Sequence, residues 1–481
     1  MVNKVDIALE IMGLFREYAC NAYLVGGSIR NLLLNIPIKD IDLATDCNPE
    51  KVESIAIANN INFIPTGLEH GTGTIIYKGN QIEITTFRID KQCYGRKADV
   101  EFGCTLEQDL SRRDFTINAM AMGLDGNIID PFNGKEDLIK RLVRAVGDPD
   151  KRFEEDQLRA LRAIRFATVL DFYIDPETFN AIKRVKLIMP ISVLDPETVG
   201  FIKHVKLALV SHERIRDELS KILESPNRSR GLDLLDKSNL LIQILPEITD
   251  LKGVSQDERY HPEKDTFIHV TLAIQALPPD ASLALVLATL LHDVGKPATR
   301  TEENNEIHFY SHEEVGAKIA EEVLRRLKFP TDIIDEVKWL VANHMRIHEF
   351  PNMRKSKQIR LVQEPYFTNL LELLKVDVMG SSALKGTPLD LDILNYIDNF
   401  ILENEEQIKR VQILITKERL ITGFDIIKLG VNPKKYGKLI GLILDTIEDE
   451  ILEERIKTRE KALEFAKGLI ERLKVEYSTK K

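Results

Sequence analysis

Two aspartates with strand-like spacing, Asp40 and Asp42, follow a glycine turn in the segment LVGGSIRNLLLNIPIKDIDLAT. Residues i and i+2 of a strand point to the same side, so the two carboxylates are expected to lie side by side. Such a pair is repulsive unless a cation neutralises it, and a few oxygen ligands shared with phosphate suit Mg²⁺. Bound there, Mg²⁺ ions can activate an attacking 3′-hydroxyl and stabilise a leaving pyrophosphate. Asp-x-Asp by itself is also common at solvated strand ends.

The glycine turn precedes these aspartates between a predicted strand and a predicted helix. Gly26 and Gly27 would let backbone amides approach an anion, while Ser28 adds a hydroxyl donor and Arg30 a cation. Glycine pairs are frequent in ordinary tight turns. Their combination with a nearby Asp-x-Asp is much rarer, and it favours a site for a phosphate-like anion beside metal ions.

A third carboxylate, Glu83, lies in the strand-like segment QIEITTF. It faces away from Ile82 and Ile84, on the opposite side of the predicted strand. It could help hold the metal or could be a surface residue of an edge strand, and both possibilities remain open.

A second group of potential metal ligands lies between residues 261 and 377. His292 and Asp293 are adjacent in the apolar segment LLHDVGKP, where such a pair is costly to bury unless a metal or another partner uses it. His308 and His348 are interpreted as surface residues outside this group. The remaining members of the group are His261, His269, His312, His344 and Asp377.

The order of the segments predicts an α/β head followed by helices. Strands are expected at 22–25, 41–44, 74–77 and 82–87, a helix at 29–34 and a polar loop at 90–99. From about residue 146 onward, apolar residues recur at helical spacing and prolines mark the breaks, so the remainder is predicted to be mainly α-helical.

A local repeat interrupts this helical part. Asp175-Pro-Glu-Thr recurs as Asp195-Pro-Glu-Thr, 20 residues later, and each copy places a proline behind an aspartate cap. We interpret the repeat as a duplicated helical unit inserted for structural reasons.

Charge and composition limit the possible partners. The 481 residues carry a net charge of −10, so binding of nucleic acid would depend on local basic faces. The stretch from Lys140 to Arg165 is the best candidate for contacting phosphates, although a solvated helix face is the ordinary alternative.

The cysteines and the N-terminus indicate the compartment. No CxxC pair is present, so free thiols in a reducing cytosol are expected for Cys20, Cys47, Cys93 and Cys104. The N-terminal segment carries acidic residues, and no apolar run approaches the ~20 residues of a membrane span. A cytoplasmic protein without a membrane segment is therefore predicted.

Further motifs follow the glycine turn in a fixed order: HGT from His70, ITTFR from Ile84, DLSRRDFTINAMA from Asp109, IIDPFNG from Ile128, RAVGDPDKRFEEDQLRALRAIRF from Arg144 and ERIRDELSKIL from Glu213. Together these motifs resemble the class II tRNA nucleotidyltransferases, a family that includes CCA-adding enzymes and bacterial poly(A) polymerases. The resemblance covers about the first 225 residues and implies a polymerase-beta-like head.

The resemblance also implies the roles of individual residues. Asp40 and Asp42 would be the catalytic ligands of Mg²⁺. Asn31 stands where the family usually has aspartate, so an ion pair supporting Arg30 is expected to be missing. The expected nucleotide-binding residues, including those from the stretch Lys140 to Arg165, are Gly26, Gly27, Ser28, Arg30, Asp109, Arg112, Arg113, Asn118, Asp156, Arg159, Arg162 and Arg165.

Asp156 and Arg159 correspond to the family's base-reading pair and are expected to share one helix face. A carboxylate only accepts hydrogen bonds and a guanidinium only donates them. Cytosine and adenine both offer an amino donor beside a ring-nitrogen acceptor, whereas uracil and guanine present the reverse. One such pair could admit CTP and ATP without a nucleic-acid template, although an ordinary surface ion pair would show the same spacing.

The histidine group resembles the HD phosphohydrolase domain of multifunctional CCA-adding proteins. This resemblance implies a divalent metal bound by His269, His292, Asp293 and Asp377, with His312 and His344 in support. The segment from Leu420 to Gly441 resembles the tail of the same proteins, except that Lys434 replaces an expected glycine.

The sequence thus predicts a CCA-adding tRNA nucleotidyltransferase acting on the tRNA 3′ end with CTP and ATP, and carrying phosphohydrolase activity. An A-adding enzyme or poly(A) polymerase is one alternative, and an HD phosphohydrolase whose head only binds RNA is another. The oligomeric state and the metal of the HD site remain open. The expected domains are a head at 1–145, a neck at 146–225, a body at 226–258, an HD domain at 259–380 and a tail at 381–481.

Overall fold

The fold was analysed in a computed structural model, which describes residues 4–67, 71–94, 97–189, 210–256, 263–304, 306–382, 392–409 and 420–478. Three predicted features, at His70, His261 and the repeat copy from Asp195, lie outside these ranges. The chain divides into two compact units, which are considered separately. The first unit is Met1–Lys252 with Leu277–Val286 and Glu322–Ile334, and the second is Gly253–Ala276 with Leu287–Glu321 and Asp335–Lys481.

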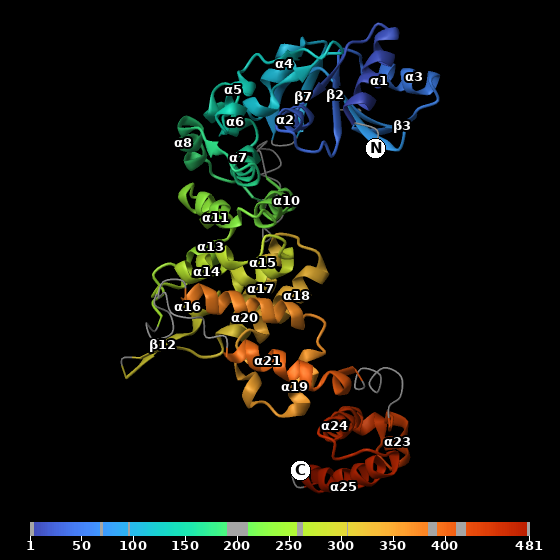
Figure 1. The fold of residues 1–481 in the computed structure, drawn as a ribbon, viewed down its shortest axis with the longest axis vertical. Coiled ribbons are helices and arrows are strands. Elements are labelled where there is room, and N and C mark those ends of the chain that lie inside the picture. Colours follow the sequence, from blue (N-terminus) through green and yellow to red (C-terminus); the bar gives the residue numbers. More distant parts are fainter. Residues whose placement is uncertain are drawn as a thin grey trace, which may run out of the picture. The chain divides into compact units, whose positions relative to one another are not determined.

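A seven-stranded sheet in the order β3-β4-β5-β2-β1-β8-β9 forms the head of the first unit (Figure 1). β2 and β5 pair in parallel, and the other neighbours are antiparallel. Leu24, Leu43 and Ile84 lie on neighbouring strands and are almost fully buried. The apolar and β-branched residues of these segments favour strands of this kind. The strands are β1 (Ala22–Val25), β2 (Ile41–Thr45), β3 (Asn62–Gly67), β4 (Thr72–Tyr77), β5 (Asn80–Thr86), β8 (Ala121–Met122) and β9 (Ile128–Ile129).

Short helices surround the sheet and complete the predicted α/β head. Thr105 begins one of them with a capping box to Gln108, which satisfies two backbone donors at that end. The helices are α1 (Lys4–Glu17), α2 (Gly27–Leu33), α3 (Pro49–Ala58), α4 (Leu106–Ser111), η2 (Thr116–Asn118) and α5 (Gly134–Ile139).

The expected polar loop at 90–99 is instead part of a hairpin, so that prediction was wrong. β6 (Arg88–Tyr94) and β7 (Lys97–Phe102) pair antiparallel from Arg88↔Phe102 to Tyr94↔Lys97. Polar composition did not prevent pairing, because the backbone supplies the hydrogen bonds of a two-stranded ladder.

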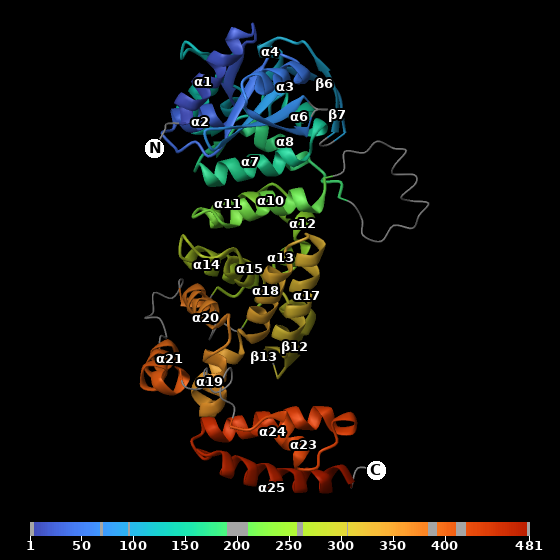
Figure 2. The same ribbon diagram turned by 90° about the vertical axis from the view of Figure 1, so that its right-hand side faces the viewer.

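Helices dominate the rest of the first unit. Figure 2 shows α7, α10 and α11 as adjacent layers beneath the head, and both α10 and α11 pack against α7. Asp175 caps α8 by accepting from Thr178 N–H at 3.1 Å, which confirms the cap expected for the first repeat copy. The elements are β10 (Leu142–Val143), α6 (Pro149–Glu155), α7 (Leu158–Val169), β11 (Tyr173–Ile174), α8 (Pro176–Arg184), α10 (His212–Leu223), α11 (Arg228–Lys237), α12 (Leu241–Ile244) and α13 (Pro246–Thr249).

The second unit is also mainly helical, and α14 packs against α20 within it. The predominance of helix after residue 146 confirms the predicted fold class. Its elements, some shared with the first unit, are α14 (Thr266–Ala276), α15 (Leu283–Leu291), α16 (Lys296–Thr299), β12 (Arg300–Glu303), β13 (Glu306–Phe309), α17 (His312–Arg326), α18 (Thr331–Asn343), η3 (Arg346–Asn352), α19 (Lys355–Val362), α20 (Phe367–Ser382), α21 (Asp392–Glu403), α23 (Gly423–Lys428), α24 (Pro433–Leu452) and α25 (Arg459–Ser478). Among the described residues, no helix has the length and apolar character needed to span a bilayer.

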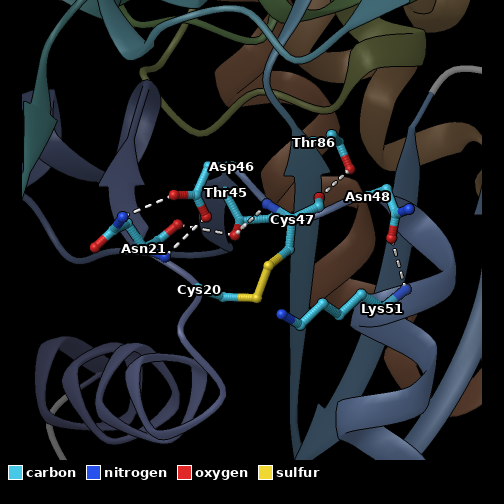
Figure 3. The surroundings of a disulfide bond; sticks show 8 residues. All are labelled: Cys20, Asn21, Thr45, Asp46, Cys47, Asn48, Lys51 and Thr86. Carbon is cyan, nitrogen blue, oxygen red and sulfur yellow. Dashed lines mark hydrogen bonds between the residues drawn. A yellow bond between two sulfur atoms is a disulfide. The ribbon is translucent and has the colours of Figure 1, made fainter.

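A disulfide joins Cys20 to Cys47, contrary to the predicted free thiols (Figure 3). The antiparallel register of β1 and β2 begins with Ala22 opposite Thr45. Each cysteine lies two residues beyond one of these strand ends, and their Cα atoms are 5.6 Å apart. Strand pairing therefore brings together two cysteines whose separation in the sequence shows no familiar pattern. Cys104 forms no disulfide in the described part of the chain, and the side chain of Cys93 lies outside it.

Candidate active sites

The glycine turn and the two aspartates meet where β1 ends and β2 begins. Gly26 has φ 65° and ψ −132°, a conformation that favours glycine. A Cβ there would lie 2.9 Å from Arg113 Nη1 and 3.8 Å from Asp42 Oδ2. The Ser28 hydroxyl donates to the carbonyl oxygen of Asp40 at 2.9 Å and accepts from the N–H of Asp42 at 3.3 Å. Ser28 thus ties the turn to the aspartate segment, and its proton is used within the protein.

Glu83 adds a third carboxylate to this end of the sheet. It is in register with Asp42 on the parallel neighbour β5, which is an interior strand and not an edge strand, although Glu83 itself is exposed as expected for a surface residue. Burial raises the pKa of Asp42 to about 6, the negative charges of Glu83 and Asp40 add to that rise, and Arg113 opposes it. Burial is the largest cause of this raised pKa, and three carboxylates that offer only oxygen atoms fit a divalent cation.

Asp109 positions two of the predicted nucleotide-binding arginines. Its carboxylate is fully buried and accepts from Arg112 Nε at 3.0 Å and Nη2 at 2.7 Å. Arg113 Nη2 lies 3.4 Å from the other carboxylate oxygen. Asp109 therefore orients both arginines, and Arg113 reaches the glycine turn.

Asn118 connects two more of the predicted residues. Its amide oxygen accepts from Arg30 Nη1 at 2.7 Å, and its amide nitrogen donates to Asp114 Oδ1 at 3.0 Å. Asp114 also accepts from Arg162 Nε at 3.0 Å and Nη2 at 2.7 Å. Asn31 accepts from Arg30 at 2.8 and 3.2 Å, so hydrogen bonds from the guanidinium to a neutral amide stand where an ion pair was expected to be missing.

Three of the predicted arginines lie around the ring of Phe166. The guanidinium of Arg165 lies 3.8 Å from the ring centroid, and those of Arg30 and Arg162 lie 5.0 and 5.6 Å away. Arg165 Nε also pairs with Glu218 at 2.5 Å. Burial and the charge of Arg165 lower the pKa of Arg30 to about 10, which still leaves it positive at neutral pH. The result is a cluster of fixed cations within the head and neck.

Asp156 and Arg159 do not share a helix face as expected. Asp156 has φ −151° and ends α6, whereas Arg159 lies in the first turn of α7. The i,i+3 rule assumed an uninterrupted helix, but Asp156 is the C-cap of α6, and its carboxylate accepts from Leu158 N–H, at the first residue of α7, at 3.2 Å. The side chain of Asp156 pairs with Arg214 at 2.6 Å, and that of Arg159 pairs with Glu155 at 2.5 Å.

In the second unit, His269, His292 and Asp377 form one tight group. His269 Nε2 is 2.9 Å from Asp377 Oδ1 and 3.2 Å from His292 Nε2. His269 lies on α14 and Asp377 on α20, and His292 directly follows α15. The structure therefore brings together potential ligands, of which His269 and Asp377 are more than 100 residues apart in the sequence.

Asp293 links this group to a second one. Its Oδ2 atom is 3.3 Å from His292 Nε2, and its Oδ1 atom is 3.5 Å from His312 Nε2 and 4.0 Å from His344 Nε2. His312 and His344 are themselves 3.1 Å apart between their Nε2 atoms. Asp293, His312 and His344 thus form a second set of three potential ligands.

Gly295 allows these groups to approach each other. A Cβ at Gly295 would lie 2.1 Å from the carbonyl oxygen of His312 and 2.7 Å from Gly316 N. Only glycine therefore lets the segment after His292 and Asp293 pack directly against the start of α17.

Backbone carbonyl groups fix three of the histidine rings through their Nδ1 atoms. The Nδ1 atoms of His292, His312 and His344 lie 2.7–2.9 Å from the backbone carbonyls of Thr289, Phe309 and Val341, respectively. Carbonyl oxygens only accept, so each Nδ1 carries the proton and each Nε2 can ligate a metal.

His269 uses a carboxylate for the same purpose. Its Nδ1 atom is 2.9 Å from Glu263 Oε1, and both side chains are inaccessible to solvent. All four Nε2 atoms thus face the cluster, and together with Asp293 and Asp377 they form a donor set that fits divalent metal ions.

The electrostatics of the cluster differ from those of the head. Burial alone would raise the pKa values of both Asp293 and Asp377. Contacts with His292 and Lys296 instead hold the pKa of Asp293 well below the usual range. Contacts with His269 do the same for the pKa of Asp377. Burial tends to lower the pKa of His269, yet its bonds to Asp377 and Glu263 raise it to about 9. The cluster thus balances its carboxylates with protonated histidine and Lys296.

One histidine was assigned wrongly. His348 Nε2 lies 3.6 Å from Asp377 Oδ2, so this half-exposed residue borders the cluster and is not a bystander. His308 stacks on Tyr310 with ring centroids 5.2 Å apart.

Several supporting residues also had no predicted role, namely Asp114, Glu155, Arg214, Glu218 and Glu263. The first four lie in the quoted motifs, but charged partners of other side chains leave no spacing signal of their own.

Comparison with known proteins identifies the family of the chain. Family profiles described as "Poly A polymerase head domain", "Probable RNA and SrmB- binding site of polymerase A" and "HD domain" match residues 22–144, 194–252 and 260–376. A CCA-adding enzyme of Lactobacillus gasseri is 40% identical over 258 residues, which are 53% of this chain and 58% of the relative. The crystal structure of the Bacillus stearothermophilus CCA-adding enzyme in complex with CTP is 26% identical, covers 100% of both chains and has a TM-score of 0.61.

A further relative extends the match along most of the sequence. The CCA-adding enzyme of Ligilactobacillus salivarius (strain UCC118) is 33% identical over 475 residues, which are 96% of each chain. The predicted resemblance is thereby confirmed, and this chain belongs to the CCA-adding enzyme family of tRNA nucleotidyltransferases and carries an HD domain.

Proposed function

We propose that this protein adds CMP and AMP, taken from CTP and ATP, to the 3′ end of tRNA without a nucleic-acid template. The observation that carries the proposal is the meeting of Asp42, the Gly26 turn and Arg113 at one point of the head. Support comes from the relatives named as CCA-adding enzymes, one of which was solved with CTP.

In this proposal Asp40 and Asp42 hold Mg²⁺, and Glu83 adds negative charge beside them. Bound Mg²⁺ would supply charge neutralisation for the triphosphate and activation of the tRNA 3′-hydroxyl. Gly26 and Gly27 leave room for the triphosphate to approach the backbone, and Ser28 fixes that turn to the aspartate segment.

The arginines of the head would contact the phosphates. Arg113 and Arg112 are oriented by Asp109, and Arg30 is oriented by Asn118. Arg162 and Arg165 add further positive charge around Phe166. Because their carboxylate and amide partners already fix these cations, little side-chain entropy would be lost when a triphosphate binds.

Asp156 and Arg159 would select the base. An acceptor-only carboxylate and a donor-only guanidinium match the amino group and ring nitrogen shared by cytosine and adenine. Uracil and guanine would face mispaired polar groups at a cost of about 1–3 kcal/mol each. Asp156 lies at the end of α6 and Arg159 at the start of α7, so the two residues would act from two helices instead of one helix face.

The histidine cluster favours a second activity, hydrolysis of phosphate or cyclic-phosphate ends. His269, His292, Asp293 and Asp377 would hold a divalent metal, and His312 and His344 would share Asp293 to support a second one. A bound metal would supply an activated water. The domain limits predicted from the sequence, 1–145, 146–225, 226–258, 259–380 and 381–481, are part of this proposal, as is action on tRNA in the cytoplasm.

One assay tests the nucleotide-adding function. The protein would be incubated with tRNA lacking CCA, tRNA ending in CC and an unrelated RNA, each with labelled CTP or ATP. Incorporation of two C and then one A into the first tRNA is expected. Addition of A alone, or of long A tails on any RNA, would instead establish the A-adding or poly(A)-polymerase alternative.

A further inference from the structure

The carboxylate of Asp156 is held in a fixed plane by Arg214, a residue of α10. Arg214 Nη2 donates to Asp156 Oδ2 at 2.6 Å, and Nη1 donates to Oδ1 at 3.3 Å. The two side chains are 23% and 12% exposed, so solvent competes little with this contact. Such two-pronged pairs fix orientation as well as charge.

The contact spans two separate parts of the first unit. Arg214 lies in the first turn of α10, where its N–H bonds to the Ser211 cap at 3.4 Å, and α10 packs against α7. Asp156 lies at the break between α6 and α7. The direction of its carboxylate is therefore set by a helix from outside its own segment.

The remaining acceptor capacity of Asp156 is small and directed. A carboxylate offers about four lone-pair positions. Oδ1 accepts from Leu158 N–H and Arg214, and Oδ2 accepts from Arg214, among the contacts of the described residues. An incoming base amino group would meet one fixed acceptor position, mainly on Oδ2.

Arg159 has its own support and does not depend on Arg214. Its guanidinium bonds to Glu155 at 2.5 Å and to the carbonyl oxygens of Arg152 and Arg112, each at 3.2 Å. The acceptor and the donor of the base-reading pair are thus positioned by two independent sets of contacts.

We propose that Arg214 is a positioning residue for nucleotide specificity, because it fixes the Asp156 carboxylate so that it accepts from an amino group. The inference rests on the proposed base-reading function of Asp156. A free carboxylate can rotate about its last torsion, which is broad, and would then discriminate less between an amino group and a carbonyl group. A fixed one keeps its acceptor aimed at a single point.

Arg214→Lys and Arg214→Gln test the proposal, with Arg216→Lys as a matched control. Arg216 lies on the same helix, but it pairs with the exposed Asp217 at 2.7 Å. For each variant, kcat/KM would be measured with CTP and with UTP on tRNA lacking CCA. We expect the CTP-to-UTP ratio to fall roughly tenfold in Arg214→Lys and further in Arg214→Gln, and to stay unchanged in the control.

A purely structural role would lower kcat/KM for CTP and UTP by the same factor and leave their ratio unchanged, which would overturn the inference. Arg214→Lys keeps the charge and most of the side-chain volume, so it remains informative if Arg214→Gln does not fold. Asp156→Asn separates the two proposals. If its CTP-to-UTP ratio equals that of the wild type, the base-reading function of Asp156 fails; if the ratio falls while the Arg214 variants keep theirs, only the role of Arg214 fails.

Discussion

The candidate site of the head and the histidine cluster both gather carboxylates, but they balance the negative charge differently. In the head, Asp40 is exposed, and the pKa of Asp42 is raised to about 6 by burial and by Glu83. In the cluster, Asp293 and Asp377 have pKa values well below the usual range because histidines and Lys296 surround them. At Asp42, burial and the neighbouring carboxylates outweigh the arginines, whereas at Asp293 and Asp377 the neighbouring cations outweigh burial.

This difference indicates how each site would receive its ligands. A cation entering the head relieves repulsion that already exists between the carboxylates. A cation entering the cluster must displace a proton, because His269 has a pKa of about 9 and is protonated at neutral pH. We therefore expect ions in the head to come and go with nucleotide and the buried cluster to hold a resident metal.

The largest expected effect separates the two activities. Asp42→Ala should reduce nucleotide addition at least ~1,000-fold, because metal-assisted charge stabilisation is worth several kcal/mol. Phosphohydrolase activity should stay within about twofold of the wild type, since the cluster shares no ligand with the head. Incorporation of labelled nucleotide and release of phosphate from a phosphorylated RNA end would be measured side by side. Addition that persists in Asp42→Ala would remove the basis for the proposed site.

Asp293→Ala should produce the reverse pattern. Its two oxygens face both groups of histidines, so bound metal measured by elemental analysis should fall close to zero and phosphohydrolase activity at least ~100-fold. His308→Ala is the control, because His308 stacks on Tyr310 outside the cluster. Full metal content in Asp293→Ala would show that this carboxylate is not a ligand.

The pH dependence of metal binding gives a smaller but sharper contrast. A carboxylate or imidazole must lose its proton before it ligates, so affinity rises with pH up to the pKa of the ligand. Mg²⁺ binding to the head, measured in Asp293→Ala, should strengthen until about pH 6, the pKa of Asp42, and then level off. Metal binding to the cluster, measured in Asp42→Ala, should keep strengthening to about pH 9, the pKa of His269. Each pH unit should change the metal affinity by up to ~tenfold per released proton. If the head and the cluster showed the same dependence of affinity on pH, the proposed difference between the two sites would be wrong.

Local patterns in the sequence were sufficient to predict most of the fold. The strand predicted at 22–25 coincides with β1, and the others overlap β2, β4 and β5. These elements depend on side-chain periodicity, which is a local property. The hairpin β6–β7 was missed because its residues are polar and its stability comes from backbone pairing.

The sites were predictable only as sets of residues. Motif spacing identified Asp40, Asp42 and the six members of the histidine cluster that the structure describes, but not the contacts that orient them. The helix break at Asp156, the register of Glu83 and the contact of His348 with Asp377 arise from tertiary structure. A single sequence has no local signal for such contacts.

The Cys20–Cys47 disulfide has a consequence for limited proteolysis. The covalent loop it closes contains the glycine turn and both aspartates, and the backbone at Asn35, Ile36 and Pro37 is exposed on that loop. A protease that cuts there would leave Gly26 on one fragment and Asp42 on the other. The β1–β2 ladder and the disulfide would still hold the fragments together, so the nicked protein would run as one band on a denaturing gel until a reductant separated it into two.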